Sequence, residues 1–256
     1  MGVENTMTVW DFSGFVGAWG YWPLKERTGA DVLALMDAHG IARAVVGSTR
    51  ALESDWRQGN ADILAAAAES GGRLVPFVTI DNTQSGTSEL LAEYAAAGAK
   101  GIRCYPSHHH NTLPSQLEPL CAAAQDHELI VTLVMRAIMD WSFPVAAVEP
   151  FEGLLAQFPD VQFVIHGLNY GQEAWHGIRL LNTYPNVWLE TSCLQGLGGI
   201  ARWVAHADVG RILLGTGVPL QYPACGIAKL EKAEISAADK EAIAHRNAQR
   251  LLAYST

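Results

Sequence analysis

The sequence predicts one closed barrel of eight parallel strands, each followed by a helix, which is the (β/α)8 or TIM-barrel fold. Three observations favour this α/β fold. Short apolar stretches rich in Val, Ile and Leu alternate with helical patterns along the whole chain. The length of 256 residues suits one such barrel, which typically needs about 250. No low-complexity linker divides residues 1–256, so we expect a single domain.

The apolar stretches lack the strict alternation of half-exposed strands, as expected for parallel strands that are buried on both faces. We expect strands at Thr8–Phe12, Ala42–Gly47, Leu74–Ile80, Gly101–Tyr105, Ile130–Met135, Gln162–Ile165, Val187–Thr191 and Arg211–Gly215. An open, doubly wound sheet is the alternative. The Gly-x-Gly-x-x-Gly turn of dinucleotide-binding sheets does not follow the first strand, so the barrel is preferred.

Helical patterns separate these strands. Alanine-rich sequence favours one of the helices, a glycine ends another, and a proline begins a third. We expect helices at Asp55–Glu69, Ser88–Ala97, Pro114–Asp126, Phe151–Gln157 and Asp239–Ala253.

Composition excludes several classes of protein. The net charge of −9 argues against a nucleic-acid partner, which needs a basic surface. No apolar stretch approaches the roughly 20 residues of a membrane helix, and the N-terminus does not have the pattern of a signal peptide. The four cysteines form no Cys-x-x-Cys motif, and we expect free thiols in a cytoplasmic protein.

Several short segments follow one another in a characteristic order. They are Asp11–Gly17, Gly59–Asn60, Gly98–Pro106, Phe158–Gly167, Asn186–Ser192, Arg211–Pro219 and Asn247–Leu252. Together they resemble the amidohydrolase superfamily, in its amidohydrolase 2 branch of metal-dependent TIM-barrel hydrolases. The resemblance covers nearly the whole chain and implies the barrel fold and a hydrolytic ancestry.

The chain departs from this family at the metal ligands. Two histidines that leave the first strand in the family correspond to Ser13 and Phe15 here. Met135 replaces a histidine after the fifth strand, and Gly217 replaces the aspartate that binds metal and activates water. Of the usual set His166 remains, and one imidazole does not make the three- or four-ligand site that holds zinc. We therefore expect neither a metal nor another cofactor.

The active site of a TIM barrel lies at the C-terminal ends of its strands, and polar residues predicted there are the site candidates. The catalytic candidates are His166, Glu190 and Asp140. The substrate-binding candidates are Arg136, His108, His110, Tyr105, Trp19 and Asn169.

Most of these residues have a second interpretation. His166 can act in acid–base chemistry, because imidazole titrates near neutrality, or can be a hydrogen-bonded structural histidine. Arg136 can grip a substrate carboxylate or can form a salt bridge with Asp140. Glu190 can orient His166 or a water, or can accept backbone hydrogen bonds. The three consecutive histidines His108–His110 cannot all point to one metal, so we expect one of them to line the pocket.

Two functions remain open. The first, which we favour from the sequence, is a metal-independent hydrolase of a lactone or amide, or a decarboxylase or other lyase, that acts on a small anionic organic molecule. The second is a catalytically silent barrel that binds a ligand or a paralogous metal-bearing subunit. An open polar pocket favours the enzyme, and a pocket filled by Phe15, Met135 and tryptophan side chains favours the silent barrel. The sequence also leaves a homo-oligomer open.

Overall fold

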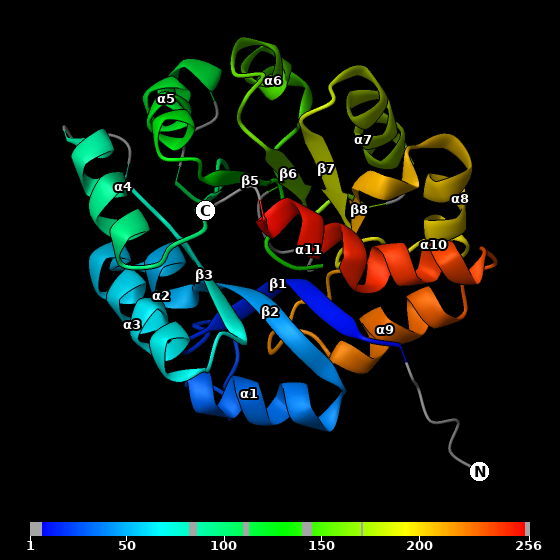
Figure 1. Cartoon of the computed structure of the whole chain (residues 1–256), viewed down its shortest axis with the longest axis horizontal. Helices are drawn as coiled ribbons and strands as arrows, with labels where there is room; N and C mark the ends of the chain where they lie inside the picture. The colour runs from blue at the N-terminus through cyan, green and yellow to red at the C-terminus, as the bar shows by residue number, and fades with distance from the viewer. Residues whose placement is uncertain (1–6, 82–85, 110–112, 140–144, 170, 254–256) are drawn as a thin grey trace.

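The computed structural model describes residues 7–81, 86–109, 113–139, 145–169 and 171–253. Eight strands follow one another around a single parallel sheet (Figure 1). The strands are β1 Val9–Val16, β2 Ile41–Ser48, β3 Leu74–Val78, β4 Gly101–Cys104, β5 Ile130–Val134, β6 Phe163–His166, β7 Val187–Glu190 and β8 Ile212–Leu213. The Phe12 N–H donates to the Leu214 carbonyl at 2.8 Å and thereby links β1 to the end of β8. The predicted (β/α)8 barrel is confirmed.

The ends of several expected strands are corrected. The first strand continues to Val16 instead of ending at Phe12, because a register shift between Asp11 and Gly14 keeps it paired with β2. The eighth strand shortens to Ile212–Leu213, since Arg211 belongs to the preceding 3-10 turn. His166 is the last residue of β6 and does not follow the strand.

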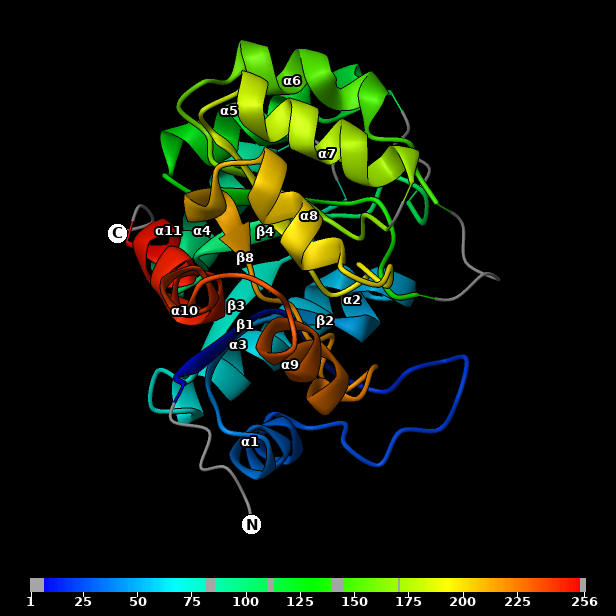
Figure 2. The same ribbon diagram turned by 90° about the vertical axis from the view of Figure 1, so that its right-hand side faces the viewer.

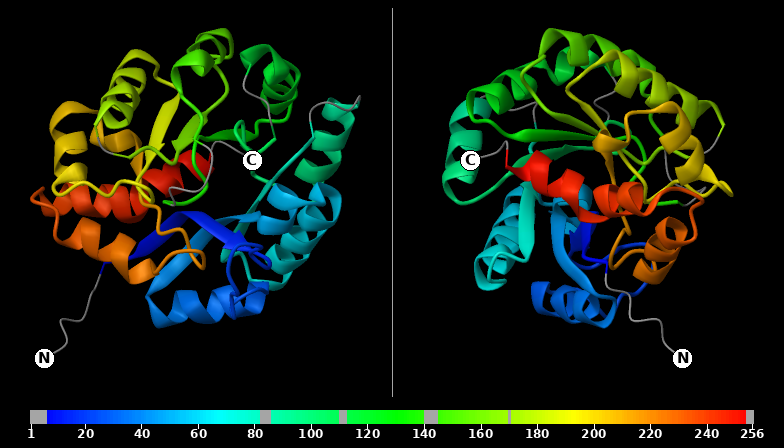
Figure 3. Two further views of the ribbon diagram at one scale, coloured as in Figure 1. Left: turned by 180° about the vertical axis from the view of Figure 1, so that it is seen from behind. Right: turned by 45° about the vertical axis from the view of Figure 1, so that its right-hand side comes forward.

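Helices surround the strands as an outer ring (Figure 3). They are α1 Gly29–Ala38, α2 Thr49–Glu53, α3 Trp56–Glu69, α4 Thr87–Ala96, α5 Glu118–Asp126, α6 Glu152–Gln157, α7 Gln172–Thr183, α8 Gly199–His206, α9 Pro223–Glu231, α10 Ala237–Glu241 and α11 Asn247–Leu252. Short 3-10 turns are η1 Pro114–Gln116, η2 Glu149–Phe151 and η3 Val209–Arg211, and η4 Ala242–Arg246 is a π-helical turn.

Two expected helices are each divided. Pro114–Asp126 consists of the 3-10 turn η1 followed by α5. Asp239–Ala253 consists of α10, a π-helical turn and α11. The other three expected helices are present within one residue of their predicted ends. Side-chain caps explain where some begin, for example Asp55, whose carboxylate accepts from the Gln58 N–H at the start of α3.

No helix of the described residues is long and apolar enough to cross a membrane.

The interior of the barrel has two apolar layers with a polar band between them. The lower layer is closed by α11, the red helix across the barrel end in Figure 1, whose Leu251 packs in the same cluster as Phe12, Phe77 and Trp188. The upper layer, at the C-terminal ends of the strands, contains Phe15, Trp19, Leu52, Tyr105, Val134, Ala137, Ile138 and Leu220. The polar band therefore lies inside the barrel with apolar side chains on both sides.

The segment between β1 and α1 reaches over the upper layer. It is the blue loop that extends from the barrel in Figure 2. The Gly17 N–H donates to the Arg27 carbonyl at 2.8 Å and so ties its two ends together. Trp19 packs into the upper layer from this loop, and Trp22 lies against it.

Candidate functional site at the barrel centre

The polar band is formed by the inward-facing residues that follow the lower apolar layer along successive strands. It contains Thr79, Arg103, Thr132, His166 and Glu190, all 1% exposed or less. Strand alternation explains their orientation, because their sequence neighbours Ile102, Val131, Leu133, Ile165 and Leu189 pack outside the barrel against helices. The band is thus buried, and access to it requires movement of the upper layer.

His166 lies between two acceptor atoms. Its Nδ1 is 3.0 Å from Oε2 of Glu190, and its Nε2 is 3.2 Å from the carbonyl oxygen of Ala137. Burial disfavours a charged ring, but the Glu190 carboxylate and the nearby Cys193 outweigh burial and raise the pKa of His166 to about 10. Both neighbours are acceptors, an arrangement that favours an imidazolium with both nitrogens protonated.

Glu190 is held as a carboxylate by the loop that follows it. Burial opposes its charge, yet His166 and the hydrogen bonds from Ser192 lower the pKa of Glu190. The Ser192 hydroxyl donates to Oε2 at 2.9 Å, and the Ser192 N–H donates to Oε1. Lys229 of α9 fixes the same loop, since its ammonium donates to the carbonyls of Thr191, Ser192 and Leu194, each at 3.1 Å.

Asp11 and Ser13 of β1 form a hydrogen-bonded turn with the segment after β8. Asp11 accepts from the Ser13 N–H at 2.9 Å and from the Thr216 N–H and hydroxyl at 2.8 and 2.5 Å. Ser13 in turn accepts from the Gly217 N–H at 2.8 Å. Burial raises the pKa of Asp11, and the neighbouring Glu190 charge adds to that effect.

A catalytic metal does not fit the side chains at this centre. The described residues include no group of three or more His, Cys, Asp and Glu placed to hold an ion. Phe15 and Met135, at two positions where the resemblance to the family implies ligands, are apolar and buried. Gly217 has no side chain, and Ser13 is used by the turn with Asp11.

Arg136 pairs with a carboxylate of the protein. Its two terminal nitrogens lie 3.0 Å from the two carboxylate oxygens of Glu173 on α7, and one also donates to the Gly167 carbonyl. The expected alternative partner, Asp140, lies outside the described residues. Glu173 was not expected from the sequence, because α7 was not among the predicted helices. The substrate-binding role of Arg136 stays a prediction.

The remaining candidates are dispersed around the mouth. Tyr105 and Trp19 are in the buried upper layer. His108 lines a rim cavity of about 360 Å³ with Glu53 and Tyr21. His109 instead places Nε2 2.9 Å from the Leu52 carbonyl.

His110 lies outside the described residues, so its predicted role is untested. Asn169 joins two loops: its N–H donates to Glu173, and its side-chain oxygen accepts from the Gln195 N–H. That pattern gives Asn169 a clear structural contact, while its substrate-binding role stays a prediction.

Arg103 is a buried charge that the sequence analysis did not single out. Its guanidinium donates to the carbonyls of Gly14 at 2.8 Å and Val45 at 3.2 Å, and it lies over the Phe15 ring at 4.8 Å from the centroid. Its place in the strand could have indicated this burial, because strand alternation puts Ile102 and Cys104 on the outside of the barrel and Arg103 on the inside.

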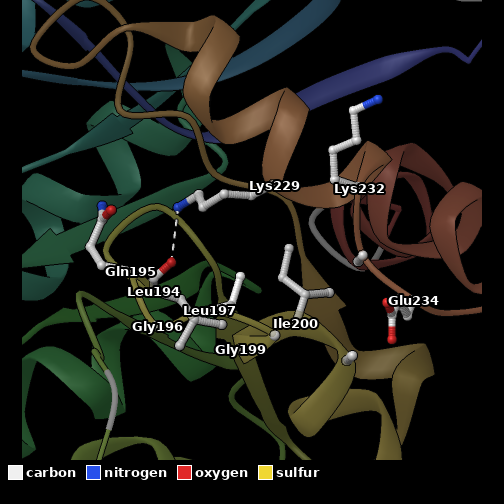
Figure 4. Close-up of a pocket in the computed structure, with 12 residues that line it drawn as sticks. Leu194, Gln195, Gly196, Leu197, Gly199, Ile200, Lys229, Lys232 and Glu234 are labelled. Carbon is white, nitrogen blue, oxygen red and sulfur yellow. Dashed lines mark hydrogen bonds between the residues drawn. The ribbon is translucent and has the colours of Figure 1, made fainter.

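A larger cavity of about 460 Å³ lies away from this centre, between the loop after β7, the start of α8 and the end of α9 (Figure 4). Leu194 and Ile200 form apolar walls. Lys229 points toward the loop and donates to the Leu194 carbonyl, the dashed contact in Figure 4. The cavity therefore borders the loop that holds Glu190.

Residues 10–253 match the model of the amidohydrolase family of the amidohydrolase 2 type. The chain belongs to this family. No curated protein matches the sequence.

Solved structures with the same fold cover nearly the whole chain at low sequence identity. A Pseudomonas putida protein with the provisional name 2-pyrone-4,6-dicarboxylic acid hydrolase has a TM-score of 0.71 and 19% identity, over 98% of this chain and 99% of its own. The 2,6-dihydroxybenzoate decarboxylase from Rhizobium has a TM-score of 0.73 and 16% identity, over 98% and 100%. An uncharacterised TIM-barrel protein from Bordetella bronchiseptica has a TM-score of 0.73 and 21% identity, over 97% and 99%. These similarities support the barrel fold.

Proposed function

We propose that this chain is a catalytically silent member of the amidohydrolase 2 family that binds a small organic anion. The observation that carries the proposal is the environment of His166, whose Nδ1 and Nε2 lie 3.0 Å from Glu190 and 3.2 Å from the Ala137 carbonyl. A general base needs a free lone pair close to the proton it removes. With both nitrogens protonated, His166 has no such pair and instead links β6 to β7 and to the segment after β5.

The metal-assisted route of the family is not part of this proposal. By the resemblance of its segments to the family pattern, Ser13, Phe15, Met135 and Gly217 correspond to the family's ligand positions. Zinc needs three or four N, S or carboxylate donors, which these four residues do not supply. The buried position of the band between two apolar layers also supports a structural role for its charges.

The test is the protonation state of His166 in solution. Ring nitrogens labelled with ¹⁵N report by NMR whether one or both carry protons, and His166→Asn assigns the signal. We expect both His166 nitrogens to remain protonated at pH 8, because its pKa is raised to about 10. A ring that loses a proton near neutral pH would contradict the proposal and return His166 to the role of base.

A second candidate is a metal-independent hydrolase of a lactone or amide, or a decarboxylase, that acts on a small organic acid. It is favoured by family membership and by the names of two structural neighbours, a dicarboxylic acid hydrolase and a hydroxybenzoate decarboxylase. Turnover of 2-pyrone-4,6-dicarboxylate or 2,6-dihydroxybenzoate tests it. This candidate expects His166→Asn to reduce the rate by about 100-fold or more, as when a general base is lost. The silent barrel expects no turnover in either protein.

A further inference from the structure

We propose that the β3–β5 side of the barrel interior, around Arg103, is a binding site for a small monoanion of the size of formate, acetate or chloride. The inference deepens the proposed function, on which it rests for the class of ligand, because it places the anion at named residues. It rests on a separate set of contacts from the His166–Glu190 pair. The site lies in the polar band, on strands that carry neither His166 nor Glu190.

The charge of Arg103 is buried without a carboxylate partner among the described residues. The guanidinium is 1% exposed, and no carboxylate among the described residues forms an ion pair with it. Backbone carbonyls of β1 and β2 and the face of Phe15 solvate part of the group, but they bring no negative charge. A buried charge is costly unless it is paired, so a bound anion would stabilise this position.

Several hydrogen-bond donors near that charge also lack partners. In the described residues, the Arg103 Nε and the hydroxyl oxygens of Thr79, Tyr105 and Thr132 are buried without a hydrogen-bond partner. Arg103 is the register partner of Thr132 across β4 and β5, so their side chains face the same interior region. All four groups can donate a hydrogen bond, as an anion requires.

The Tyr105 hydroxyl belongs to this group of buried donors. Tyr105 belongs to the same apolar cluster as Phe15, and the Arg103 guanidinium lies over the Phe15 ring, so both side chains face the same part of the interior. Burial raises the pKa of Tyr105, while Arg103 and Thr79 oppose that rise. The guanidinium can only donate, whereas each neutral hydroxyl can both donate and accept, and a bound anion would supply further acceptor atoms for these donors. Thr79 is also fixed from outside, since Asn60 of α3 donates to its carbonyl at 2.8 Å and accepts from its N–H at 2.9 Å. The donors are therefore held in place before an anion arrives.

Burial sets the size of the ligand. The apolar layers above and below the band enclose these groups, so a compact monoanion fits better than an extended dicarboxylate. The upper layer includes Trp19 from the loop between β1 and α1. Movement of this loop is the route by which an anion would reach Arg103.

The experiment measures thermal unfolding of the full chain with sodium formate, acetate or chloride at constant ionic strength, with sodium gluconate as the balancing salt. A ligand that binds only the folded state raises the unfolding temperature by mass action. We expect at least one of the three small anions to stabilise the wild type in a saturable manner, and formamide to have no such effect. Loss of a charged hydrogen-bond partner in Arg103→Met should weaken the apparent affinity by about tenfold or more.

Arg211→Met is the matched control. Arg211 also donates to backbone carbonyls, but it has a carboxylate partner in Asp208, so its loss should leave the response to anions unchanged. Thr132→Val and Tyr105→Phe each remove one hydroxyl with little change in shape, and each should weaken the response, which keeps the test decisive if Arg103→Met fails to fold. The inference is wrong if no small anion stabilises the wild type, or if the Arg103 and hydroxyl variants respond as the wild type does. Neither result alters the His166 titration that tests catalytic silence.

Discussion

Three charged side chains at the barrel centre are buried in different ways. His166 and Glu190 are 0% exposed and neutralise each other at 3.0 Å. Arg103 is 1% exposed and relies on carbonyl groups and an aromatic ring. A buried ion pair contributes little net stability, but removal of one partner leaves an uncompensated charge and is strongly destabilising. At the scale of single residues, the pair is therefore a fixed unit, and Arg103 is the group with an unmet electrostatic requirement.

The pair makes stability depend on pH. The pKa of His166 is raised from 6.5 to about 10, so its protonated ring stabilises the fold fully below pH 6.5 and loses this contribution as pH rises toward 10. Within that range the folded state binds one more proton than the unfolded state. The free energy of unfolding therefore falls by up to about 1.4 kcal/mol for each unit by which the pH rises. Urea unfolding at pH 7, 8 and 9 measures this slope.

Glu190→Gln is the control for that slope. The amide keeps the shape of the side chain but removes the charge that raises the pKa of His166. We expect the variant to be less stable at pH 7 and to have a flatter dependence of stability on pH. Equal slopes in wild type and variant would show that His166 is not held as an imidazolium.

The loop after β7 is the element that organises the centre. Ser192 in this loop donates twice to Glu190, and Lys229 of α9 donates to three carbonyl groups of the loop. Gly215 allows the segment after β8 to approach Glu190, since a Cβ atom there would lie 1.8 Å from Oε1 of Glu190. Contacts from α9 and from the segment after β8 thus determine where the Glu190 carboxylate lies.

Lys229→Met should loosen this loop. The thioether chain keeps most of the apolar stem but leaves the carbonyls of Thr191, Ser192 and Leu194 without their donor. Leaving buried acceptors unsatisfied costs about 1–3 kcal/mol. We expect a loss of that order in the free energy of unfolding and faster amide hydrogen exchange in residues 191–195. Lys232→Met, an exposed lysine beside the same cavity, should change stability by less than about 0.5 kcal/mol, and an equal effect of both variants would contradict the role of Lys229.

For the whole molecule, the sequence predicted the architecture because strand and helix patterns depend on local periodicity. Eight apolar stretches and the order of the family-like segments were enough for the barrel. Contacts between residues far apart in the sequence were harder to predict. The Arg136–Glu173 pair joins residues 37 positions apart on the segment after β5 and on α7. Its prediction would have required the helix α7, which the sequence analysis did not identify.

The sequence suggested that His166 and Glu190 lie close together, but it did not indicate the protonation state of His166. Both residues end adjacent strands, so their proximity follows from the barrel. The second acceptor, the Ala137 carbonyl, depends on how the chain turns after β5, which periodicity does not encode. Arg103 was visible as a charge inside an apolar strand, yet its missing carboxylate partner is a property of the folded interior. The fold was thus predictable, whereas the bonding at its centre was not.

The loop between β1 and α1 covers this closed centre, and its Trp19 side chain is buried at 4% exposure. Trp19→Ala should remove packing from the upper layer and lower the free energy of unfolding by about 3–5 kcal/mol, as for other large core truncations. Tyr21→Ala, on the same loop but 60% exposed, should change it by less than about 0.5 kcal/mol. If the loop controls access, amide exchange in β4 and β5 should accelerate in Trp19→Ala beyond the increase that reduced global stability explains. Exchange that tracks global unfolding in both variants would show that the upper layer opens only when the barrel unfolds.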